Sequence, residues 1–125
     1  MTFTLPYPPS VNHYWLPAKQ GGMRIGPRGK AYRAAVEAAM IDQGHWKIVY
    51  DGRGPLYTAR LRVQVLAYPP DRIRRDLDNL AKAALDALES AGIYQDDSQI
   101  DDLHIIRRQV DPPGRLEVTI EKMAK

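Results

Sequence analysis

Two aspartates stand two positions apart in the segment Asp76-Leu77-Asp78, at the start of a predicted helix. Carboxylates at positions i and i+2 project to the same side of an extended chain, but they lie about 200° apart on a helix. Asp76 and Asp78 can therefore share a metal ion only if Asp76 precedes the helix, at the position of an N-cap. In the alternative interpretation Asp76 is simply the cap, and Asp78 complements the positive charge of the first turn. The spacing alone leaves both interpretations open.

Lys82 follows Asp78 by four residues and so lies one helical turn further along the chain. Such a pair can form a surface ion pair that contributes a few tenths of a kcal/mol to stability. It can equally place a cation beside a metal ion, where it stabilises negative charge that builds on a phosphate in the transition state. The spacing does not distinguish these two functions.

Two further pairs of adjacent carboxylates, Asp96-Asp97 and Asp101-Asp102, follow this helix. Adjacent carboxylates repel each other unless water or a cation screens them. For Asp101 and Asp102 we favour a solvated turn. The connection after the helix could instead bring Asp96 or Asp97 back toward Asp76 and Asp78. Three converging carboxylates would form an oxygen-only Mg²⁺ or Mn²⁺ site, which is suited to phosphodiester hydrolysis.

Basic and acidic residues are segregated along the chain, although the net charge is only +3. Residues 1–75 carry 12 Lys and Arg against four Asp and Glu, a net charge of +8. Residues 76–102 carry one Lys against eight carboxylates, a net charge of −7. A basic surface gathers phosphates and clustered carboxylates hold divalent cations. A solvated acidic helix would give the same counts, so charge alone does not decide.

The basic residues nearest to the aspartates are candidates for contacts with a phosphate-rich partner. Three of them, Arg72, Arg74 and Arg75, directly precede Asp76. A second group lies in a glycine-rich segment and the first predicted helix: Arg24, Arg28, Lys30 and Arg33. The aromatic residues near the start of the chain could stack on bases or belong to the core, and the core is the commoner place for Trp15. They are Tyr7, Tyr14 and Trp15.

Other chemistries are excluded or disfavoured by the composition. The chain has no cysteine, which excludes disulfides, Cys-ligated zinc, iron–sulfur clusters and thiol nucleophiles. Its histidines, His13, His45 and His104, lack the spacing of a zinc site. No glycine-rich loop matches a nucleotide-binding motif, and no GxSxG sequence is present. The first residues resemble neither a signal peptide nor a membrane span, so we expect a soluble, cytoplasmic protein.

Hydrophobic periodicity predicts the elements that must position these residues. Strands are predicted at Phe3–Leu5, Tyr57–Ala67, Leu103–Val110 and 116–121, and helices at Lys30–Gln43 and Leu77–Ala91. The segment Val11–Gly29 is predicted to be a loop, and residues 45–55 are predicted to be irregular. The order β–α–β–α–β–β predicts a single α+β domain over residues 1–125, with one mixed sheet and two helices. A turn at Asp111-Pro112-Pro113-Gly114 predicts that the last two strands pair as a hairpin.

Several of these motifs, in their order along the chain, together resemble the RusA family of Holliday junction resolvases. The combination is specific, whereas each motif alone is weak. The resemblance covers most of the chain, is strongest from Pro69 onward, and finds no counterpart for His45–Pro55. Ile73 interrupts the arginine run of the family. The matching segments are Pro8-Pro9-Ser10-Val11-Asn12, Asp71–Leu80, Lys82, Ala91-Gly92-Ile93 and Asp96–Ile100.

The resemblance implies a RusA-like homodimer that requires Mg²⁺, for which Mn²⁺ can substitute, and resolves four-way DNA junctions by paired symmetrical cuts. Asp76, Asp78 and Asp97 correspond to the metal-binding carboxylates of the family, with Asp96 in place of Asp97 if the alignment shifts by one residue. Lys82 corresponds to the functional lysine of the family, and Arg75 to a basic residue beside the site. Members are often encoded by phages and prophages, so we expect a phage, prophage or bacterial origin.

From these residues we predict in-line attack of an activated water on a backbone phosphate, with Mg²⁺ held by three aspartates and Lys82 stabilising the developing charge. A C2 homodimer would supply one site for each of two strands. The alternatives are a non-catalytic module that binds branched or single-stranded DNA, and a Mg²⁺ enzyme acting on nucleotides or small phosphate esters. The broad basic surface disfavours the last. The residues predicted to bind DNA are Arg72, Arg74, Arg75, Arg28, Lys30 and Arg33.

Overall fold

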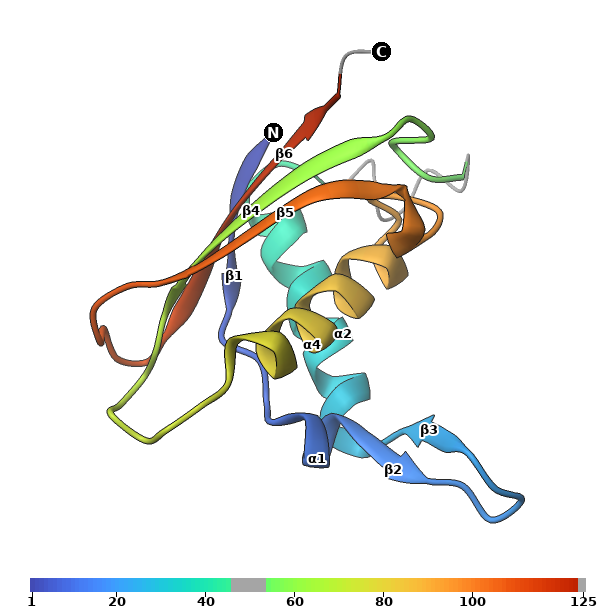
Figure 1. The fold of residues 1–125 in the computed structure, drawn as a ribbon, viewed down its shortest axis with the longest axis vertical. Helices are drawn as coiled ribbons and strands as arrows, with labels where there is room; N and C mark the ends of the chain where they lie inside the picture. The colour runs from blue at the N-terminus through green and yellow to red at the C-terminus, as the bar shows by residue number, and fades with distance from the viewer. Residues whose placement is uncertain (46–53, 124–125) are drawn as a thin grey trace.

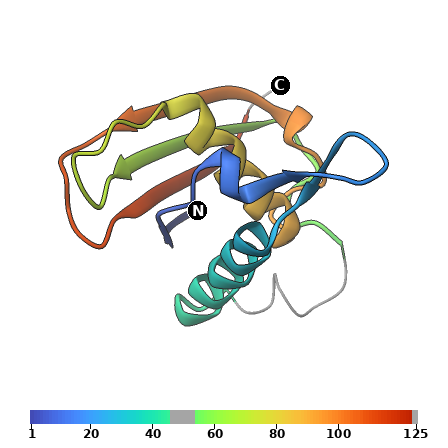
Figure 2. The ribbon, with the colours of Figure 1, turned by 90° about the horizontal axis from the view of Figure 1, so that it is seen from below.

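The computed structural model describes residues 1–45 and 54–123, and it packs a four-stranded sheet against two long helices (Figure 1). Helices α2 and α4 lie on the same face of the sheet (Figure 2). The predicted α+β class with a mixed sheet is confirmed. Most of the predicted irregular segment, residues 46–53, lies outside the described residues. Within those residues, no helix combines the length and the apolar character that crossing a bilayer requires.

Strand β6 occupies the middle of the sheet, where it pairs antiparallel with both β1 and β4. Strand β5 pairs with the other side of β4, in parallel. The order across the sheet is therefore β1-β6-β4-β5. The strand bounds are Thr2–Pro6 for β1, Leu61–Tyr68 for β4, Ile100–Arg107 for β5 and Arg115–Lys122 for β6.

The predicted hairpin between the last two strands is wrong, because β6 pairs with β1 and β4 rather than with β5. The physical reason is burial. Leu116, Val118 and Ile120 of β6 are fully buried between β1 and β4 in the sheet and the core beneath it, as suits a central strand. Leu103 and Ile106 of β5 are 40% and 41% exposed, as an edge strand permits.

Strand β4, helix α4 (Leu77–Ser90) and strand β5 form a parallel β–α–β unit. Parallel neighbours need a crossover connection, and here α4 provides it. In such a unit, the residues that enter the helix follow the carboxyl end of the first strand. Those that leave it precede the amino end of the second strand. Asp76 and Asp97 therefore lie at opposite ends of the sheet, with Asp97 in the short helix η1 (Asp97–Gln99).

The two long helices follow the predicted apolar periodicity. Helix α4 begins at the predicted residue and buries the small side chains of Ala83, Ala84 and Ala87 against the core. Helix α2 (Pro27–Asp42) begins three residues earlier than predicted, because the fixed φ of Pro27 suits a first helical turn.

The segment 11–29, predicted to be a loop, contains regular structure and corrects that prediction. It forms the short helix α1 (Val11–Tyr14) and a hairpin of β2 (Trp15–Pro17) and β3 (Met23–Ile25). The frequent glycines and prolines of this segment led to the prediction of a loop. In the structure, some of these residues are instead required by the packing of the short elements. A Cβ at Gly29 would lie 2.6 Å from the Tyr14 carbonyl oxygen, so glycine permits α2 to approach α1. The predicted element order was therefore incomplete.

Candidate active site

Asp76 directly precedes α4 in an extended backbone conformation, with φ −90° and ψ 136°. Its side chain is exposed and makes no capping hydrogen bond to the helix. The geometric condition for sharing a ligand with Asp78 is therefore met, and the interpretation of Asp76 as a side-chain cap is not supported. Asp78 is exposed in the first turn, where its Oδ1 accepts a hydrogen bond from the Asn79 backbone N–H at 3.0 Å.

Lys82 is exposed one turn beyond Asp78 on α4. Among residues 1–45 and 54–123, we find no ion pair that Lys82 forms with a carboxylate. A surface ion pair with Asp78 is therefore not what this structure shows.

A cavity lies beside Asp76, between the segment 7–12 and the beginning of α4. Ser10 and Asn12 line one part of it, and Arg74, Asp76 and Asn79 line another. Helix α1 contacts α4, which brings these two segments together although they are far apart in the sequence. The two parts of the chain that carry the family resemblance thus meet in one cavity.

The loop before Asp76 is held by the carboxylate of Asp71. Its Oδ1 accepts from the Ile73 backbone N–H at 2.9 Å, and both carboxylate oxygens accept from the Arg75 guanidinium. Arg75 lowers the pKa of Asp71, and Asp71 raises the pKa of Arg75. The Arg75 guanidinium also lies 5.5 Å from the Tyr7 ring centroid. Arg75 is therefore engaged within the protein, whereas Arg72 and Arg74 are exposed.

A second cavity next to this loop is lined by arginines from two elements. Arg72 and Arg74 come from the loop, and Arg107 and Arg108 come from the end of β5. Arg107 also donates a hydrogen bond to the Arg75 carbonyl oxygen. Our sequence reasoning missed Arg107 and Arg108. No local signal in the sequence indicated them, because they join Arg72 and Arg74 only through the parallel pairing of β4 with β5.

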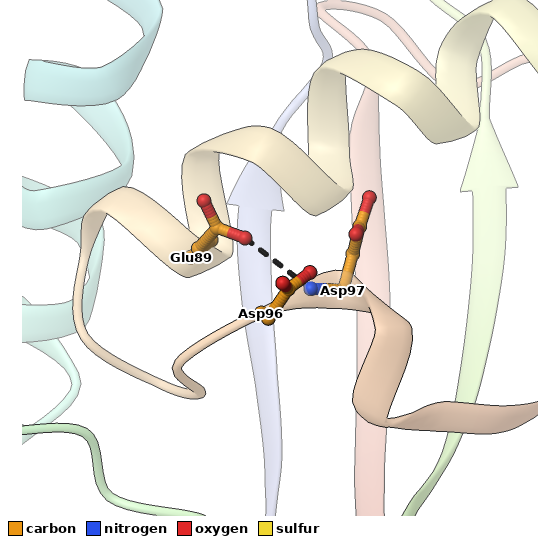
Figure 3. Close-up of side chains that lie close together, drawn as sticks. All are labelled: Glu89, Asp96 and Asp97. Carbon is orange, nitrogen blue, oxygen red and sulfur yellow. Dashed lines mark hydrogen bonds between the residues drawn. The ribbon is translucent and has the colours of Figure 1, made fainter.

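Three carboxylates gather at the other end of α4, within 4.8 Å of one another (Figure 3). They are Glu89 of the last helical turn and the adjacent Asp96 and Asp97. Glu89 Oε1 accepts from the Asp97 backbone N–H at 3.2 Å. Partial burial raises the pKa of Glu89. The sequence analysis missed Glu89, which its position in the turn facing Asp96-Asp97 could have indicated.

Asp96 and Asp97 differ in their hydrogen bonds. The Asp96 side chain caps η1 by accepting from the Ser98 backbone N–H at 3.0 Å, which lowers the pKa of Asp96. A hydrogen bond with the Asp96 side chain raises the pKa of Asp97. Asp97 is thus the member of the pair that is not used as a cap.

The expected convergence of Asp97 on Asp76 and Asp78 does not occur within one chain. Glu89, which contacts Asp97, lies 13 residues along from Asp76, and at 1.5 Å per residue α4 separates them by about 20 Å. The connection after the helix leads to the start of β5 rather than back along α4. The structure thus places two carboxylates at one end of α4 and three at the other.

The remaining predicted residues have varied surroundings. Arg28 and Lys30 are exposed near the start of α2, and Arg28 Nη1 lies 3.1 Å from His13 Nδ1. Arg33 forms a bidentate ion pair with Asp86, with both hydrogen bonds at 2.9 Å, so its guanidinium is already bound within the protein. DNA binding by Arg33 stays a prediction.

The predicted solvated turn at Asp101 and Asp102 is wrong, because both residues belong to strand β5. They pair with Arg60 and Arg62. Among the aromatic candidates, Tyr14 is fully buried and Trp15 packs against the core, whereas Tyr7 lines both cavities.

Comparison with known proteins connects this arrangement to one family. The chain matches the family model described as Endodeoxyribonuclease RusA over residues 6–121. It is 40% identical to the crossover junction endodeoxyribonuclease rusA of Enterobacteria phage HK97, over 97% of this chain and 93% of that protein. The RusA proteins of Shigella sonnei strain Ss046 and Escherichia coli strain K12, with the same description, are 38% and 37% identical. Each match covers 98% of this chain and 94% of the relative.

Proposed function

The chain belongs to the RusA family of endodeoxyribonucleases, and on that premise we propose that it resolves four-way DNA junctions by hydrolysing phosphodiester bonds. The description of the relatives as crossover junction endodeoxyribonucleases supports this function. Their origin in phages and enterobacteria supports a phage, prophage or bacterial origin and action in the cytoplasm.

The observation that carries the proposal is the amino end of α4. Asp76, whose side chain makes no capping hydrogen bond, lines a cavity there, and Asp78 is exposed in the first turn of the helix. Exposed arginines line the neighbouring cavity. Exposed carboxylates next to exposed arginines have a functional explanation in a metal-dependent reaction on a phosphate. A helix cap and a solvated face would not require the exposed arginines around them.

Asp76 and Asp78 fit a hard divalent cation, because their exposed carboxylates offer only oxygen ligands. When bound there, Mg²⁺ or Mn²⁺ lowers the pKa of a water molecule and offsets negative charge on the phosphate. Lys82, exposed one turn further along α4, would stabilise the leaving oxygen. Arg72 and Arg74 would hold the neighbouring backbone phosphates, with Arg28 and Lys30 contributing further along the DNA.

We further propose that the third carboxylate of each site comes from a second copy of the chain. One copy separates Asp97 from Asp76 by about 20 Å, the length of α4. A C2 dimer with α4 helices side by side and antiparallel would place Asp97 of the partner subunit next to Asp76 and Asp78. Such a dimer contains two equivalent sites, which matches the need to cut two strands of a junction symmetrically.

The test is cleavage of a labelled synthetic four-way junction in Mg²⁺, with linear duplex of the same sequence as comparison. We expect paired nicks in the junction only. Asp78→Asn should reduce the rate at least about a hundredfold while junction binding persists, because the variant removes a metal ligand but no phosphate contact. Asp42→Asn, an equally exposed aspartate at the end of α2, should cut like the wild type.

Binding of the junction without cleavage by the wild type, in both Mg²⁺ and Mn²⁺, would contradict the proposed function. So would an Asp78→Asn variant that cuts at the wild-type rate.

A further inference from the structure

The second cavity, beside the loop that precedes α4, has a strong excess of positive charge. One carboxylate among its described lining residues, Asp71, is already paired with Arg75. For the four exposed arginines of the lining, we find no carboxylate partner within the described residues: Arg72, Arg74, Arg107 and Arg108. Like charges gathered in one place repel each other, and a bound anion relieves that repulsion. A phosphate suits this cavity, because its oxygens accept paired hydrogen bonds from a guanidinium.

Arg107 differs from the other three arginines, because it also holds the backbone of the loop. It is the last residue of β5, and its Nη2 donates a hydrogen bond to the carbonyl oxygen of Arg75. That carbonyl belongs to the peptide bond that joins Arg75 to Asp76. A guanidinium carries five N–H donors in a rigid plane, so the bond to this carbonyl leaves other donors for a ligand in the cavity. One planar group can thus contact a bound phosphate and the backbone next to Asp76 at the same time.

The orientation of the Asp76 carboxylate depends on its backbone, because its side chain makes no capping hydrogen bond to α4. On the helix side, the Asp76 carbonyl oxygen accepts from the Leu80 backbone N–H at 3.3 Å, which is a long hydrogen bond. On the loop side, the hydrogen bond from Arg107 holds the preceding peptide. A shift of the Arg107 guanidinium would therefore move the peptide from which the Asp76 side chain projects.

We propose that the second cavity binds a backbone phosphate of the junction, and that Arg107 is a positioning residue that couples this phosphate to the placement of Asp76. The inference rests on the proposed function and makes the cleavage step depend on a phosphate other than the one that is cut. Arg74 and Arg75 line both cavities, so the bound phosphate belongs to a nucleotide near the cleaved bond. DNA that leaves the second cavity empty would be cut slowly even when it is bound.

The experiment replaces single phosphates near the cleaved bond of a four-way junction, but not the cleaved phosphate itself, by uncharged methylphosphonates. Single-turnover cleavage rates are measured at saturating protein, and junction affinity is measured separately without metal. The proteins are the wild type, Arg107→Ala, Arg107→Lys and the control Arg62→Ala. Arg62 is an exposed arginine of β4 that donates to Asp102 at 2.8 Å and lines neither cavity. Thermal unfolding reports whether each variant is folded.

At one phosphate position, we expect the methylphosphonate to slow cleavage by the wild type about tenfold, and Arg107→Ala to slow cleavage of the unmodified junction to a similar extent. The same methylphosphonate should slow Arg107→Ala by less than about twofold, because the phosphate and the side chain act through one contact. Arg107→Lys should bind the junction like the wild type but cut it slowly, since a single ammonium does not bridge the phosphate and the carbonyl in a fixed plane. Arg62→Ala should cut every junction like the wild type.

The inference is overturned if no methylphosphonate slows the wild type, or if Arg107→Ala weakens binding without slowing the single-turnover rate. It is also overturned if Arg107→Ala slows modified and unmodified junctions by the same factor, which is the result that a purely structural role of Arg107 would give. A wild-type rate for Arg107→Lys would show that charge alone suffices, and would exclude the bridge. In all these cases the wild type still cuts the unmodified junction, so the proposed function stands. If the wild type does not cut the unmodified junction, the proposed function fails, and the inference fails with it.

Discussion

The two ends of α4 both carry carboxylates, but their surroundings are opposite in charge. At the amino end, Asp76 and Asp78 face the positive end of the helix, and exposed arginines lie close by. At the carboxyl end, Glu89 lies next to Asp96 and Asp97 (Figure 3). Partial burial raises the pKa of Glu89, and a hydrogen bond with Asp96 raises that of Asp97.

Each end of α4 lacks what the other end has. The amino end has groups for phosphate and the two carboxylates of Asp76 and Asp78, whereas its third described carboxylate, Asp71, is paired with Arg75. The carboxyl end has an excess of negative charge, which a cation or a basic surface would relieve. A two-fold axis between antiparallel α4 helices would join each amino end to a carboxyl end of the other copy.

The largest expected effect comes from mixing two inactive variants. Asp78→Asn and Asp97→Asn should each lose at least about a hundredfold in junction cleavage, because each removes one ligand from both sites of the dimer. In a heterodimer of the two variants, one composite site contains both substitutions and the other contains neither. An equal mixture allowed to exchange subunits should therefore regain roughly a quarter of the wild-type nicking rate.

The control for this mixture is Asp76→Asn mixed with Asp78→Asn, because those residues belong to the same end and no intact site can form. If Asp78→Asn and Asp97→Asn do not rescue each other after verified subunit exchange, the proposed sharing of the site between subunits is wrong. Asp96→Asn tests the alternative third ligand. We expect it to retain more activity than Asp97→Asn, since the Asp96 side chain caps η1.

A smaller effect is expected from the arginines at the amino end. Arg108 is exposed in the second cavity, so Arg108→Ala should remove one phosphate contact. The slope of log K against log salt concentration for junction binding should then decrease in magnitude by about 0.9. Arg60→Ala removes an arginine that pairs with Asp101 near the carboxyl end, and it should leave the slope unchanged. Equal slopes for Arg108→Ala and the wild type would exclude this surface from the DNA interface.

The local elements of this fold could be predicted from the sequence, whereas their arrangement could not. The apolar periodicity of α4 predicted its first residue, because one face of that helix is buried along its whole length. The pairing of β6 with β4 was missed, because alternation in a strand reports one buried face but not which neighbours it has. The short strands β2 and β3 were missed because three residues carry no periodicity.

The candidate site shows the same division: its local pair of aspartates could be predicted from the sequence, whereas its relation to distant residues could not. Asp76 and Asp78 are close in the sequence, so the local spacing was informative about both. Their relation to Asp97 depended on the direction in which the chain leaves α4, and the parallel pairing of β4 with β5 determines that direction. Arg108 was missed for a similar reason, since it joins Arg72 and Arg74 only through tertiary contacts. Glu89 is only eight residues from Asp97, so its part in the acidic group was within reach of the local sequence.

The smallest expected effect separates structural ion pairs at the two ends by pH. Asp71 pairs with Arg75 at the amino end, Asp101 pairs with Arg60 near the carboxyl end, and these arginines lower the pKa of both carboxyls. A lowered folded-state pKa adds stability above the ordinary pKa of 3.8, and that stability is lost as pH falls through the folded-state value. Asp71→Asn and Asp101→Asn should therefore each lower Tm by about 1 °C at pH 7, and the difference from the wild type should vanish in acid.

Only Asp71→Asn should also slow junction cleavage, by about fivefold, because only Asp71 holds the loop that carries Arg72 and Arg74 beside Asp76. Equal cleavage rates for the two variants, measured at pH 7 alongside thermal unfolding, would show that the Asp71 pair stabilises the fold without positioning the site.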